Sequence, residues 1–143
     1  MTTRMPVPSH PPPLVLLAED DDEMRYLMTR ALRRDGYDVL AAADAEALSS
    51  ALMAARLHGR EPDLVVSDVR MPGMSGLELV AWLRRQDCDV RIVLVSAFAD
   101  DEIVAEARRL GVAHVLSKPF DLDDLRTVVL HLLSPPRGSV PPA

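Results

Sequence analysis

The stretch Val65–Gly76, VVSDVRMPGMSG, runs from a short apolar segment into an aspartate and then into a loop of methionine, proline and glycine. The apolar part has the length of a buried strand, and Asp68 stands where that strand ends. Pro72 and Gly73 favour a turn directly after it. This order predicts a carboxylate at the open end of a buried strand.

Other short apolar segments occur at intervals on both sides of this stretch. With it they make five expected strands: Leu14–Ala18, Asp38–Ala42, Asp63–Ser67, Arg91–Ser96 and His114–Leu116. The segments between them have the period of amphipathic helices. Strict alternation of apolar strands with helices predicts an α/β domain with a five-stranded parallel sheet, doubly wound by right-handed crossovers on both faces.

The intervening segments carry apolar residues at helical spacing, with capping residues at several of their ends. The predicted apolar stripes are Met24, Leu27, Met28 and Ala31; Ala45, Leu48, Leu52 and Ala55; Leu77, Val80 and Ala81; Ile103, Ala107 and Leu110; and Leu122, Leu125, Val129 and Leu132. Asp44 can cap the second helix, and Gly36 can end the first.

Length and composition limit the class of protein. A chain of 143 residues fits one domain, which we expect over 14–133, between proline-rich tails at 1–13 and 134–143. The net charge of −6 argues against direct binding of nucleic acid or anionic membranes. The single cysteine, Cys88, excludes an internal disulfide. With no apolar run long enough for a signal peptide or a membrane span, we expect a cytoplasmic protein.

Charged and polar side chains follow the predicted strands at their carboxyl ends, where ligands bind in doubly wound sheets. Glu19 and Asp20 follow the first strand, Asp68 the third, Ser96 the fourth and Lys118 the fifth. If the first and third strands are neighbours, Asp20 and Asp68 face each other and repel unless a cation lies between them. Oxygen ligands without histidine or cysteine favour Mg²⁺ over Zn²⁺.

Lys118 and Ser96 complete a set that suits phosphoryl transfer. The ammonium can pair with Asp68 or with a phosphoryl oxygen, and the hydroxyl can hydrogen-bond another oxygen. A carboxylate beside a metal, a lysine and a hydroxyl can accept a phosphoryl group as an acyl phosphate.

Four motifs in this order, LLAEDDDEMR, VVSDVRMPGMSG, IVLVSA and LSKPF, resemble the receiver domain of two-component response regulators. The resemblance covers Leu14 to about Leu133 and implies a flavodoxin-like (βα)5 fold with strand order 2-1-3-4-5. It implies that Asp68 is the phosphoacceptor and that Ser96 and Lys118 contact the phosphoryl oxygens. It also implies a Mg²⁺ site formed by Asp20, Asp68 and the backbone carbonyl of Arg70, with Glu19 contributing through water.

The resemblance further implies a cis peptide bond between Lys118 and Pro119, and a role in signalling rather than conventional enzyme activity. A histidine kinase or a histidine phosphotransfer protein would donate the phosphoryl group. The fourth helix, fifth strand and fifth helix would then present an altered face to an effector or to a second copy in a dimer. The identity of the effector is left open.

The sequence departs from the family where many receivers carry an aromatic residue that turns inward on phosphorylation; here the residue is Val115. We therefore expect signalling through the loop after Ser96 and the fourth helix. Arg70 and Phe98 lie two residues beyond Asp68 and Ser96. Their bulk predicts a shielded acyl phosphate that hydrolyses slowly.

Two alternatives remain open. A phosphatase that uses Asp68 as a transient nucleophile needs a second acid two residues later, and Arg70 in that place argues against it. A degenerate receiver would bind partners without phosphorylation, which the complete set of Asp68, Ser96 and Lys118 disfavours.

Overall fold

The computed structural model describes residues 11–134, and the predicted tails lie mostly outside this range. It contains ten elements in strict alternation: β1 (Leu14–Ala18), α1 (Asp22–Arg34), β2 (Asp38–Ala42), α2 (Ala45–Leu57), β3 (Leu64–Asp68), α3 (Gly76–Arg85), β4 (Arg91–Ser96), α4 (Asp101–Arg109), β5 (His114–Ser117) and α5 (Leu122–Leu133). Among the described residues, no helix combines the length and apolar character that crossing a membrane requires.

The five strands form one parallel sheet in the order β2-β1-β3-β4-β5, which confirms the predicted fold class and strand order. β1 and β3 are neighbours at the centre, where every residue of both strands is buried. β3 lies one residue later than predicted and ends on Asp68 itself, because Asp68 stays in register with Val95 of β4.

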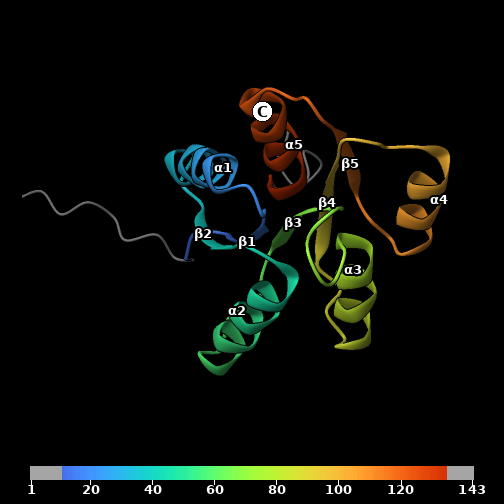
Figure 1. Cartoon of the computed structure of the whole chain (residues 1–143). Coiled ribbons are helices and arrows are strands. Elements are labelled where there is room, and N and C mark those ends of the chain that lie inside the picture. The colour runs from blue at the N-terminus through green and yellow to red at the C-terminus, as the bar shows by residue number, and fades with distance from the viewer. Residues whose placement is uncertain (1–10, 135–143) are drawn as a thin grey trace, which may run out of the picture.

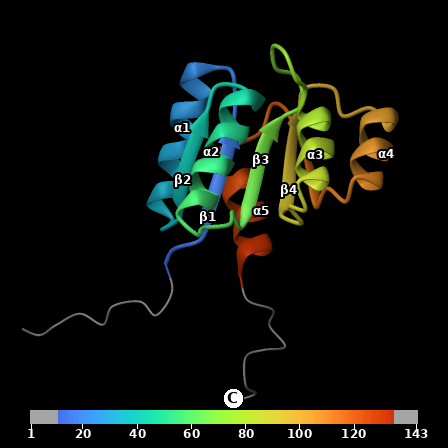
Figure 2. The same ribbon diagram turned by 90° about the horizontal axis from the view of Figure 1, so that it is seen from below.

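The helices cover both faces of the sheet, as the alternation predicted (Figure 1). α1 and α5 lie on one face, and α2, α3 and α4 lie on the other (Figures 1 and 2). Alternate residues of β1 divide between two apolar clusters: Leu16 packs with α2 and α3, and Leu17 packs with α1 and α5. This division is the period-two geometry of a strand buried on both faces.

Capping residues fix where the helices begin. Asp21, Asp44, Ser75 and Asp100 each accept a hydrogen bond from a backbone amide three residues later. The apolar stripe of α2 is buried as predicted, but the stripe predicted for α1 is partly wrong. Leu27 is exposed, and Leu32 is fully buried in its place.

Backbone hydrogen bonds continue beyond the strands and order the carboxyl edge of the sheet. The amide of Glu19 donates to Ala42 at 3.0 Å, that of Val69 donates to Val95 at 2.9 Å, and that of Lys118 donates to Ser96 at 2.8 Å. The segments that carry the predicted site residues are therefore held against neighbouring strands.

Candidate functional site

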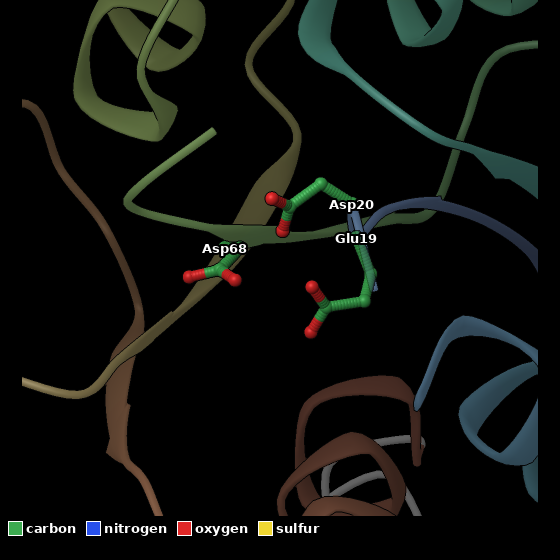
Figure 3. Close-up of side chains that lie close together, drawn as sticks. All are labelled: Glu19, Asp20 and Asp68. Carbon is green, nitrogen blue, oxygen red and sulfur yellow. The ribbon is translucent and has the colours of Figure 1, made fainter. Parts of the chain in front are cut away.

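Three carboxylates meet at the carboxyl ends of β1 and β3. Glu19 and Asp20 follow β1, and Asp68 is the last residue of β3 (Figure 3). One oxygen of each side chain lies within 4.8 Å of the corresponding oxygens of the other two. Asp20 is exposed, whereas Glu19 and Asp68 keep only 1% and 6% of their surface. The adjacency of the two central strands thus brings the predicted acids together.

Lys118 reaches this group from the loop after β5. Its Nζ donates to Oδ2 of Asp68 at 2.8 Å and to Oε1 of Glu19 at 3.3 Å. The bond between Lys118 and Pro119 is cis, as predicted. Burial lowers the pKa of Lys118, but the hydrogen bond and charge of Asp68 outweigh this effect and raise it overall. Lys118 therefore stays protonated beside the two buried acids.

Glu19 has the most perturbed environment of the three acids. Burial is the largest cause and raises its pKa to about 7, and the negative charge of Asp68 acts in the same direction. The amide of Asp21 donates to Oε2 of Glu19 at 3.2 Å and opposes this shift. The sequence did not predict the direct contact of Glu19 with Lys118, because the two residues are 99 positions apart.

The hydroxyl and the loop residues complete the predicted set. Ser96 is buried at the end of β4, and its Oγ accepts a hydrogen bond from the amide of Phe98 at 3.1 Å. The guanidinium carbon of Arg70 lies 5.2 Å from the centre of the Phe98 ring, in cation–π geometry. The two residues expected to shield the acceptor are thus in contact with each other. Val115 is half-buried against the α2–α3 side of the core.

The donor set fits a hard divalent cation. With all three carboxylates ionised, the single charge of Lys118 leaves two negative charges uncompensated within a few ångströms. Oxygen ligands of this kind, partly open to water through Asp20, are those that Mg²⁺ prefers. A cation at this position also relieves the unfavourable ionisation of buried Glu19.

The chain belongs to the response regulator receiver domain family, whose model matches residues 15–130. Receiver domains are generally signalling modules of two-component systems, and they bind Mg²⁺ through acidic residues.

The chain is similar to curated proteins of several kinds. The chain is 29% identical over 116 residues to sporulation initiation phosphotransferase F of Bacillus subtilis, covering 80% of this chain and 89% of that protein. It is 39% identical over 119 residues to the sensor kinase CckA of Brucella abortus, covering 83% of this chain but 12% of that protein. Against the regulatory protein AtoC of Escherichia coli it is 30% identical, covering 83% of this chain and 25% of that protein. The chain therefore spans a quarter or less of the two longer relatives.

Solved structures agree with this assignment. The chemotaxis protein CheY4 of Vibrio cholerae superposes with a TM-score of 0.76 at 28% identity, covering 85% of this chain and 99% of that one. The response regulator TrrA of Thermotoga maritima, in complex with Mg²⁺ and BeF, gives a TM-score of 0.68 at 26% identity, with the same coverage.

Proposed function

We propose that this receiver domain, from Leu14 to Leu133, takes a phosphoryl group on Asp68. The observation that carries the proposal is the 2.8 Å contact of Lys118 with Asp68, inside a cluster of acids that suits a divalent cation. A buried carboxylate held by a partly exposed cation at the end of a central strand is positioned as a nucleophile. An aspartate that only capped the end of the strand would not require a lysine paired with it.

The chemistry is a transfer from phosphohistidine. An oxygen of Asp68 forms a bond to phosphorus while the phosphorus–nitrogen bond of the donor breaks, and the leaving imidazole takes up a proton. Mg²⁺ held by Asp20, Asp68 and the carbonyl of Arg70, with Glu19 contributing through water, would supply charge neutralisation. The other residues act on the transferred group.

Lys118 and Ser96 have separate roles in this transfer. Lys118 moves its ammonium from the free carboxylate to a phosphoryl oxygen, since Asp68 loses charge at the attacking oxygen when the new bond forms. Ser96 donates a hydrogen bond from its hydroxyl to another phosphoryl oxygen, while its Oγ still accepts from the amide of Phe98. These two hydrogen bonds link the acceptor to the loop before α4 without an aromatic residue at position 115.

The donor in this proposal is a histidine kinase or a histidine phosphotransfer protein in the cytoplasm. The occurrence of the domain in a sensor kinase and in a regulatory protein supports a kinase partner and effector regions elsewhere. The chain itself acts as a signalling module and not as a conventional enzyme, with no direct contact to nucleic acid or membrane. The face formed by α4, β5 and α5 meets the effector, or a second copy in a dimer.

The test is incubation with Mg²⁺ and acetyl phosphate, followed by intact mass. We expect one stable phosphoryl gain in the wild-type protein and none in Asp68→Asn. Turnover of the donor without accumulation would favour a phosphatase. No gain and no turnover, with Mg²⁺ binding intact, would favour a receiver that binds partners without phosphorylation.

A further inference from the structure

The first residue of α3, Gly76, lies against the backbone that carries Asp68. Its amide donates to the carbonyl of Val69 at 2.8 Å. A Cβ atom built on Gly76 would lie 2.3 Å from the carbonyl oxygen of Asp68 and 2.9 Å from Cα of Val69. Favourable contacts between carbon atoms begin at about 3.5 Å, so no side chain fits here unless the backbone moves.

The overlap cannot be relieved by a side-chain movement, because the atoms that the new Cβ would meet belong to the backbone. A flexible side chain could turn away from a new methyl group, but the peptide bond between Asp68 and Val69 cannot. The amide of Val69 donates to Val95 of β4, and the hydroxyl of Ser67 donates to the carbonyl of Asp68 at 3.0 Å. A methyl group on Gly76 must therefore displace either the start of α3 or the end of β3.

The same contact closes the loop between β3 and α3. The hydrogen bond from Gly76 to Val69 joins its two ends, and Arg70 is the first loop residue inside this closure. In the proposed site, the side chain of Asp68 and the carbonyl of Arg70 hold the same ion, so their relative position depends on how the loop is closed.

We infer that Gly76 is a positioning residue, which sets the acceptor Asp68 and the Arg70 carbonyl in register for Mg²⁺. This inference rests on the proposed function for the roles of those two groups. Helix propensity alone opposes glycine at this position, because alanine is the better helix former and Gly76 does not have a positive φ. The close approach explains why alanine does not stand there.

Gly73 provides a matched control in the same loop. It has a φ of +80°, and a Cβ atom placed on it would meet nothing within 4 Å. Gly73→Ala therefore strains the loop without touching Asp68, whereas Gly76→Ala introduces the overlap without requiring a positive φ. The two variants separate loop strain from displacement of the acceptor.

The experiment measures the dissociation constant of Mg²⁺ by calorimetry, and the initial rate of phosphorylation by acetyl phosphate, for the wild type and both variants. We expect Gly76→Ala to weaken Mg²⁺ binding and slow phosphorylation about tenfold or more, the range seen when support behind a metal ligand is lost. Gly73→Ala should stay within about twofold of the wild type, because it leaves those ligands in place. If Gly76→Ala unfolds in buffer, all three proteins are titrated in trimethylamine N-oxide, which favours the compact state.

Wild-type affinity for Mg²⁺ in folded Gly76→Ala would overturn the inference, and so would an equal loss in Gly73→Ala. Failure of the proposed function has a different signature. The wild type would then bind Mg²⁺ without gaining a phosphoryl group, and the Mg²⁺ titration alone would still decide the role of Gly76.

Discussion

Two clusters in this molecule have the same composition, one cation between two carboxylates, and differ in their surroundings. The buried cluster consists of Lys118, Asp68 and Glu19, and the surface cluster consists of Arg126, Asp35 and Asp123. In the buried cluster the acids keep 8% and 1% of their side-chain surface. In the surface cluster the acids keep 24% and 85%, and Arg126 keeps 46%.

Burial changes what the same charges do. Arg126 binds both oxygens of Asp35 at 2.8 Å and joins α5 to the end of α1. Water and salt weaken such exposed pairs, so they contribute little to stability. In the buried cluster the acids cannot recover lost interactions from water, and removing one partner is costly. The buried cluster therefore responds strongly to a proton, a metal ion or a phosphoryl group.

The largest effect is expected from removing Lys118, the cation that pairs with the two buried acids. Lys118→Met leaves two acids close together and removes the contact to the transferred group. Loss of a charge-assisted hydrogen bond predicts phosphorylation slower by about tenfold or more and, at pH 8, a free energy of unfolding lower by about 1–3 kcal/mol. Intact-mass spectrometry of samples quenched at successive times measures the phosphorylation rate, and urea denaturation measures the free energy of unfolding. Lys118→Arg, which keeps the charge, is the control; unchanged rates in Lys118→Met would contradict the role given to Lys118.

The next effect is a pH dependence that belongs to Glu19. Its folded pKa of about 7 lies above its ordinary value of 4.5, so the folded state binds more protons between these values. The stabilising contribution of protonated Glu19 is complete below its ordinary pKa of 4.5. Without metal, the free energy of unfolding falls by about 1–3 kcal/mol as the pH rises from there toward about 7.

Urea denaturation of Glu19→Gln tests this origin, because the variant lacks the titrating group and should have a flatter pH profile. Saturating Mg²⁺ should also flatten the wild-type profile, since the cation favours the ionised carboxylate. The same pH slope in the wild type and in Glu19→Gln would assign the effect to another group.

A smaller effect is expected at the rim of the site. Arg70→Ala or Phe98→Ala removes the cation–π contact between the two residues that we expect to shield the acceptor from water. A contact of about 1 kcal/mol predicts acyl-phosphate hydrolysis faster by up to about fivefold. The decay of the phosphorylated mass after the donor is removed gives the rate. A lifetime that does not change in either variant would show that these side chains do not shield the acceptor.

The smallest effect is expected in the surface cluster. Arg126→Met should lower the free energy of unfolding only slightly, and the difference should shrink in high salt. Its phosphorylation rate should equal that of the wild type. A stability loss as large as that of Lys118→Met would remove the contrast between the two clusters.

Apolar runs typical of strands buried on both faces predicted the parallel sheet, and the order of its strands was implied by the resemblance to receiver domains. The sequence was less informative where tertiary neighbours select one face of a helix. In α1 the apolar spacing allowed a stripe through Leu27, but packing against the sheet and α5 buries Leu32 instead. In α3 the buried residues Leu79 and Leu83 were missed for the same reason.

The site could be predicted as a set of residue types, together with the pairing of Lys118 with Asp68, but its other contacts could not. Strand ends brought Asp20, Asp68 and Lys118 into the expected region, since parallel strands end at one edge. The link of Glu19 to Lys118 depends on side-chain direction, which spacing does not encode. The close approach of Gly76 left one sequence signal, a glycine at the start of a helix where alanine is the better helix former.

The proposed function depends on the carboxylate of Asp68 carrying the phosphoryl group. It is tested most directly by reducing the phosphorylated protein with borohydride, which converts an aspartyl phosphate to homoserine, and by locating the modified residue with tandem mass spectrometry. We expect modification at position 68 alone, dependent on Mg²⁺ and on the phosphoryl donor. Modification at Asp20 or Glu19, or at a residue outside the acidic cluster, would contradict it.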